Sequence, residues 1–146
     1  MAAPPRDEAG RVIPHDDREL IADDSFVLRS IPFEHLKSVA AGGGRYLSKA
    51  AFSASSKQRD PYEGMSVNAG SLMSAAGVPE EQSRRPGHAG LVKIRAGDLR
   101  RLGLQIGTDP LDQNPYHAQV WGVRPSHRNK IKNLAIWVDK PDDVVE

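Results

Sequence analysis

Four polar side chains have the types and the order along the chain that an anion-binding site needs. Arg29 lies inside the apolar run Ser25–Ile31, where a permanent charge is costly unless it is paired. Ser53 and Ser55 follow in a segment of small residues, and His117 begins a later apolar run. Guanidinium and hydroxyl groups on neighbouring strands suit the phosphates of a nucleotide. We therefore expect an anionic, nucleotide-like or phosphate-like ligand to bind Arg29, Ser53, Ser55 and His117.

A second interpretation of Arg29 needs no ligand. An arginine on an edge strand can extend into water, or it can pair with an aspartate of the acidic N-terminal segment. The two interpretations differ in one respect that a structure reveals. The ligand hypothesis requires Arg29 and His117 to face one concavity, whereas the second places Arg29 at the exposed surface or beside a carboxylate.

The order of these residues resembles the site order of the ADP-ribosyltransferase family, which has an early arginine, a serine-bearing second strand and a polar residue on a late strand. The resemblance implies NAD chemistry, with Arg29 on phosphate, Ser53 on ribose, and His117 or Gln119 near the reaction centre. That family typically carries a catalytic glutamate on the late strand, where this chain has His117 and Gln119. An ADP-ribosyltransferase-like or NAD-cleaving enzyme, with those two residues as catalytic candidates, is therefore an alternative function.

The chain as a whole resembles a family of small bacterial proteins with no assigned activity. Three short motifs carry this resemblance: Leu28-Arg-Ser-Ile-Pro32, Ala50-Ala-Phe52 and Pro115-Tyr-His-Ala118. It covers residues 25–138 and implies no function of its own.

Charge is distributed unevenly along the chain, although the net charge is only +1. Residues 1–24 carry three arginines against seven acidic residues, a net charge of −4, while Arg124, Arg128, Lys130 and Lys132 form a basic group without a nearby acid. Such a group can bind nucleic acid or another protein, which is the third candidate function. It can equally be a solvated face that the acidic segment partly neutralises.

Several classes of protein are not indicated by the sequence. With no cysteine, the chain has no disulfide and no thiolate ligand, and its histidines lack metal-binding spacing. Gly42-Gly43-Gly44 lacks the lysine of a phosphate-binding P-loop, so we interpret it as a connector. No apolar stretch approaches the roughly 18 residues of a membrane span, and no signal peptide is evident. We expect a cytoplasmic protein without a membrane partner, a metal or a cofactor.

The pattern of apolar residues predicts an α+β fold, in which a small mixed or antiparallel sheet of about five strands carries three to four short helices. Residues 1–24 are polar and are predicted to be a disordered acidic arm, residues 25–138 to be a single domain, and residues 139–146 to be an acidic tail. Residues 79–90 lack apolar periodicity and are predicted to be a long loop. Helices are predicted at 33–40, 71–76, 98–102 and 126–138, the second and third ending before Gly77 and Gly103.

Overall fold

The computed structural model describes residues 3–39, 42–55 and 62–145. The strands in these ranges are β1 (Phe26–Ile31), β2 (Leu36–Ser38), β3 (Arg45–Leu47), β4 (Gly64–Ala69), β5 (Gly90–Arg95), β6 (Gln105–Thr108), β7 (His117–Trp121) and β8 (Ile136–Asp139). The α-helices are α1 (Gly70–Ala75), α2 (Ala96–Arg101) and α3 (Pro125–Leu134), and three 3₁₀ turns are η1 (Phe33–His35), η2 (Lys49–Ala51) and η3 (Glu80–Ser83). The predicted α+β class is confirmed.

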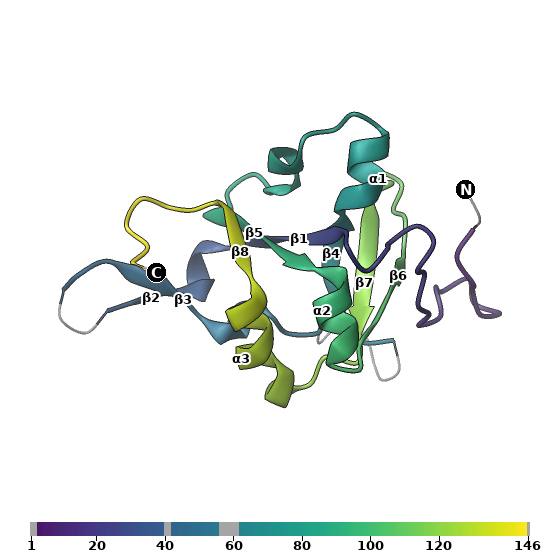
Figure 1. Ribbon diagram of the computed structural model, residues 1–146, viewed down its shortest axis with the longest axis horizontal. Coiled ribbons are helices and arrows are strands. Elements are labelled where there is room, and N and C mark those ends of the chain that lie inside the picture. Colours follow the sequence, from purple (N-terminus) through teal and green to yellow (C-terminus); the bar gives the residue numbers. More distant parts are fainter. Residues whose placement is uncertain (1–2, 40–41, 56–61, 146) are drawn as a thin grey trace.

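Six strands form one antiparallel sheet in the order β6-β7-β4-β1-β5-β8, and β2 and β3 form a two-stranded sheet that projects from one end (Figure 1). The large sheet of the described residues thus has six strands, close to the predicted five, and the small sheet adds two. Helices α2 and α3 cover one face of the large sheet and α1 covers the other (Figure 1). None of the helices in the described ranges is long and apolar enough to cross a membrane.

Alternation along β1 places its side chains on both faces of the sheet. Val27 and Ile31 belong to the larger core, which also contains Leu99 of α2 and Ile131 of α3. Leu28 belongs to a smaller core on the opposite face, with Met73 of α1 and Leu91. β1 is therefore covered on both faces by apolar side chains, while its polar residues Arg29 and Ser30 are half-buried.

The helix predictions were partly right. Helix α2 ends before Gly103, whose φ of +87° is the left-handed conformation expected of a helix C-cap. The last helix, however, ends at Leu134, and Ile136–Asp139 continues as strand β8 along β5. Ile, Trp and Val in that segment favour extended backbone, and pairing with an open sheet edge outweighs the helical spacing.

The N-terminal segment differs from the disordered arm that its composition predicts. Ile21 is fully buried in the larger core. The Arg100 guanidinium, whose side chain is only 4% exposed, donates hydrogen bonds to the carboxylates of Asp16 and Asp23 at 2.8 Å each. One apolar anchor and an arginine that binds two acids therefore hold the segment against α2. At the other end of the chain, Asp143 of the predicted acidic tail pairs with Arg45 of β3.

Candidate functional site

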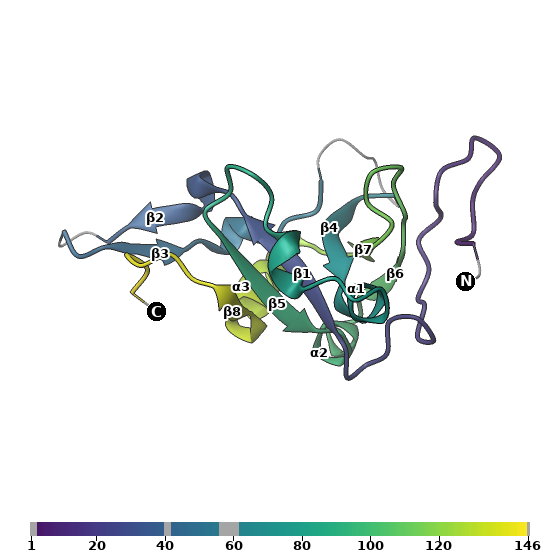
Figure 2. The same cartoon turned by 90° about the horizontal axis from the view of Figure 1, so that it is seen from above.

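The main sheet splits between its two central strands. β1 pairs with β5 along all six of its residues, but with β4 only at Val27–Ala69 and Leu28–Asn68. Beyond these pairs the two strands diverge (Figure 2). Backbone groups on the facing edges of β1 and β4 therefore need other partners, and the opening between the strands is the centre of the candidate site.

Arg29 is the first β1 residue beyond the last β1–β4 pair, and its side chain fills the split. Its Nε donates to the backbone oxygen of Ala51 at 3.1 Å, and its Nη1 donates to that of Ser66 in β4 at 2.7 Å. An arginine carries five N–H groups, so three remain for other partners. No carboxylate of the described residues forms an ion pair with Arg29. Burial, with a smaller contribution from the charge of Arg85, lowers the pKa of Arg29 to about 10.

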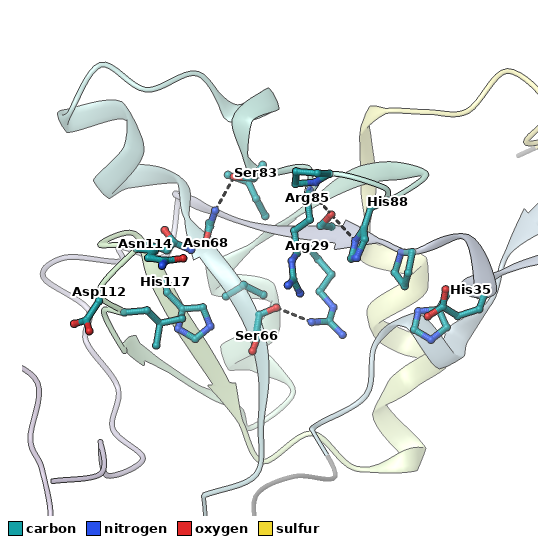
Figure 3. A pocket seen from close by; sticks show the side chains of 18 residues that line it. Arg29, His35, Ser66, Asn68, Ser83, Arg85, His88, Asp112, Asn114 and His117 are labelled. Atoms are coloured by element: carbon teal, nitrogen blue, oxygen red, sulfur yellow. Dashed lines mark hydrogen bonds between the residues drawn. The ribbon is translucent and has the colours of Figure 1, made fainter.

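A tight turn places two more polar side chains above Arg29. In Arg85-Pro86-Gly87-His88 the N–H of His88 donates to the oxygen of Arg85 at 3.0 Å, and Gly87 has a φ of +81°. Proline second and a left-handed glycine third are the signature of a type II turn. The turn thus fixes Arg85 and His88 at its two ends. Figure 3 shows the side chains of Arg29 and Arg85 next to each other at the centre of the pocket.

The pocket around this pair of arginines has a volume of about 970 Å³. Five segments supply its walls: β1, η1, β4, the loop from η3 to β5, and the loop from β6 into β7. The lining residues are Leu28, Arg29, Ser30, Pro32, Glu34, His35, Ser66, Val67, Asn68, Ser83, Arg85, Pro86, His88, Leu111, Asp112, Gln113, Asn114 and His117.

Two histidines line the side of the pocket nearest η1 (Figure 3). Burial is the main reason that the pKa values of His35 and His88 are lowered; Arg29 lowers both, Arg85 lowers that of His88, and Glu34 opposes the shift at each. His35 Nδ1 is buried and has no hydrogen-bond partner among the described residues. Both imidazoles are therefore neutral at pH 7 unless an anion enters.

The opposite side of the pocket is built from β4, β7 and the loop between β6 and β7. His117 Nδ1 lies 2.7 Å from the backbone oxygen of Asp109, which orients the ring and leaves Nε2 for the pocket. The amide of Asn114 donates to Asn68 Oδ1 at 2.7 Å, and the Asn68 amide donates to Ser83 Oγ at 3.0 Å. These side chains are held by one another and form a rigid polar wall.

Beneath this wall, a carboxylate supports His117 from outside the pocket. Burial raises the pKa of Asp109, but hydrogen bonds with His117 and Gln119 outweigh that effect and lower the pKa overall. The Gln119 amide donates to Asp109 Oδ2 at 3.1 Å.

The structure brings together only some of the residues singled out in the sequence. Arg29 and His117 line the same pocket. Ser53 and Ser55 do not line it: Ser53 Oγ donates to the backbone oxygen of Ala50 at 2.9 Å, and the Ser55 N–H donates to Gly64. Gln119 also lies outside the lining. The NAD-cleaving alternative thus keeps one of its two catalytic candidates at the pocket and stays a prediction, which release of nicotinamide from NAD would test.

The basic group at the C-terminal helix is separate from the pocket, since none of its members lines it. Arg124 is exposed and precedes α3, and Lys130 is exposed on the helix. The Lys132 ammonium lies 5.4 Å from the centre of the Tyr46 ring, and Arg128 Nε is buried without a hydrogen-bond partner among the described residues. The four cations share a helix but have different surroundings, and binding of nucleic acid by them stays a prediction.

Sequence reasoning did not include Ser30, His35, Arg85 and His88 in the ligand site. The sequence does contain a signal for Arg85 and His88. Arg-Pro-Gly-His has the composition of a type II turn, which brings its first and fourth residues together. What the sequence does not indicate is the split between β1 and β4, since it depends on pairing between distant segments.

No cluster of side chains in the described residues has the composition of a metal site. In comparisons with known proteins, no family model, no curated protein and no solved structure matches this chain.

Proposed function

We propose that the split in the sheet binds an anionic small molecule through a phosphate group. The observation that supports the proposal is Arg29: a guanidinium inside the sheet, without a carboxylate among the described residues, and with a second guanidinium, that of Arg85, directed into the same space. Two cations that face one cavity, neither of them in an ion pair with a carboxylate of the described residues, are unfavourable by themselves. A bound phosphate would remove the repulsion and provide the missing partner.

The lowered pKa of Arg29 combines burial, which is the larger cause, with the repulsion from Arg85. A fall to about 10 corresponds to a destabilisation of the charged form of Arg29 by about 3 kcal/mol. Arg29 nevertheless stays protonated at pH 7, because even the lowered pKa is well above neutrality. Much of that destabilisation would be recovered when an anion binds, which favours binding of the anion over leaving the pocket empty.

The dimensions of the pocket indicate a ligand larger than a single phosphate. A volume of about 970 Å³ lies at the upper end of the range for small-molecule sites. The arginines occupy only the centre, while the wall that carries Asn68 and Asn114 provides amide groups for another part of the ligand. A molecule of nucleotide size, with a phosphate and a hydrogen-bonding group, fits this distribution.

Titration calorimetry of the full chain with inorganic pyrophosphate tests the proposal. Arg85→Ala removes one of two charge-assisted contacts, so we expect affinity to fall about tenfold, equivalent to ~1.4 kcal/mol. Arg29→Met should abolish measurable binding. Arg101→Ala is the matched control, because Arg101 is an exposed arginine outside the pocket. Equal affinities of wild type and Arg85→Ala would contradict the proposal even if Arg29→Met failed to fold.

A further inference from the structure

A serine and a histidine in the pocket are arranged as a nucleophile and a general base. Ser30 Oγ lies 2.8 Å from Nδ1 of His88, and both residues line the pocket beside the two arginines. This distance is within the range in which a base can accept the hydroxyl proton. The backbone N–H of Arg85 donates to the same Ser30 Oγ at 2.9 Å.

The surrounding hydrogen bonds indicate that Ser30 Oγ is the donor in its hydrogen bond with His88 Nδ1. One lone pair of Ser30 Oγ is occupied by the Arg85 N–H, so the hydroxyl hydrogen is available to a neighbouring acceptor. The lowered pKa of His88 keeps its ring neutral at pH 7, and a neutral imidazole has one unprotonated nitrogen. With Nδ1 as that nitrogen, Ser30 donates to His88. The Arg85 N–H is then also placed to stabilise negative charge that develops on Oγ.

We propose that Ser30 is the nucleophile of a phosphoryl transfer reaction, with His88 as its general base. The substrate class is a phosphate monoester or anhydride, and this inference rests on the proposed phosphate site. As successive residues of β1, Arg29 and Ser30 leave opposite faces of the strand, but both line the pocket. Arg85 supplies both a guanidinium to the pocket and the N–H on Ser30 Oγ. The hydroxyl therefore shares this pocket with a phosphate that the arginines hold.

The reaction balances without any other reagent than water. Ser30 Oγ attacks phosphorus and forms an O–P bond, the bond from phosphorus to the leaving oxygen breaks, and His88 Nδ1 takes the serine proton. The leaving oxygen departs on the side of phosphorus opposite Ser30 and takes a proton from solvent water. In the second step a water oxygen bonds to phosphorus from that same side and releases its proton to solvent, while Ser30 Oγ departs and recovers its proton from His88.

The same contacts could simply hold the 84–88 turn against β1, so the test needs a readout that a structural role does not change. The probe is p-nitrophenyl phosphate, incubated with the full chain. Release of nitrophenolate follows turnover, and intact-mass analysis with peptide mapping after an acid quench detects a phosphoryl group on Ser30. The variants are Ser30→Ala and His88→Gln, with Ser53→Ala as the control because its hydroxyl lies outside the pocket.

We expect wild type and Ser53→Ala to turn over the probe and to carry the phosphoryl group on Ser30. Ser30→Ala should carry none, and both Ser30→Ala and His88→Gln should lose about 100-fold or more in rate. Calorimetry with pyrophosphate separates this inference from the binding proposal, since both variants keep Arg29 and the side chain of Arg85. The inference is overturned if wild type that binds pyrophosphate shows no turnover, if Ser30→Ala reacts at the wild-type rate, or if quenched wild type carries no phosphate on Ser30.

Discussion

Reversing the charge of Arg85 should stabilise the empty protein and abolish its proposed function. Arg85 is exposed and has no ion-pair partner among the described residues, yet its charge contributes to the lowered pKa of Arg29. In Arg85→Glu the repulsion between residue 85 and Arg29 becomes an attraction. The backbone N–H of residue 85, which donates to Ser30 Oγ, is retained. Surface substitutions usually change the free energy of unfolding by less than about 0.5 kcal/mol, so a larger increase would be a distinctive result.

The magnitude follows from the exposure of Arg85. A pair with one exposed member contributes about 0.2–1 kcal/mol, so exchanging repulsion for attraction should raise the free energy of unfolding by ~1 kcal/mol. With a urea m-value of about 2 kcal/mol/M, the midpoint should rise by about 0.5 M. Pyrophosphate at about 100 times its dissociation constant should stabilise wild type by ~2.7 kcal/mol and should not stabilise Arg85→Glu.

Urea denaturation with and without pyrophosphate measures both effects. The control is the same substitution one residue earlier, Arg84→Glu. Arg84 Nε lies 3.0 Å from Asp139 Oδ2, and Arg84 Nη1 donates to the backbone oxygen of His88 at 2.9 Å, so this variant should lose ~1 kcal/mol. If Arg85→Glu is destabilised like Arg84→Glu in anion-free buffer, or if it retains stabilisation by pyrophosphate, the account of Arg29 as an unpaired cation is refuted.

Three further predictions concern protons and the N-terminal segment. The pKa values of His35 and His88 in the folded protein lie below 6.5, so the unfolded chain binds more protons than the folded one. The free energy of unfolding should therefore fall as the pH drops below 6.5. Urea denaturation at several pH values should show a weaker pH dependence for His35→Gln. Protonated histidines attract the anion, so lowering the pH from 7.5 to 5.5 should favour pyrophosphate binding more in wild type than in His35→Gln, a comparison that cancels the titration of pyrophosphate itself; an identical pH dependence of the two affinities in calorimetry would exclude His35 from the site. Arg100→Ala leaves Asp16 and Asp23 without their shared partner and should cost ~2–3 kcal/mol, with faster proteolysis of residues 3–24, whereas unchanged stability would show that this anchor is dispensable.

The features that the sequence predicts well are those that depend on neighbouring residues in the chain. Gly103 is placed to end a helix, and φ of +87° confirms it, because glycine tolerates that backbone conformation at little cost. Arg29 stands out because a charge within an apolar strand needs an explanation, and that argument uses only the local sequence. The fold class follows in the same way from alternating apolar residues.

The parts that the sequence did not predict depend on tertiary pairing. Val138 continues the helical spacing of Ile131 and Leu134, but the edge of β5 was available and Ile136–Asp139 pairs with it. The acidic N-terminal segment looks too polar to fold, but it supplies Ile21 to the core and two carboxylates to Arg100. Ser53 seemed a suitable partner for Arg29, yet it follows a 3₁₀ turn and bonds to its own backbone.

The most direct test of the central claim is a crystal structure of the full chain grown with a saturating concentration of pyrophosphate. We predict electron density for the anion in the split between β1 and β4, with its oxygens in hydrogen-bonding contact with the guanidinium groups of Arg29 and Arg85. An empty split under conditions that calorimetry shows to be saturating, or an anion bound instead to Arg124, Arg128 and Lys130 at the C-terminal helix, would contradict the claim.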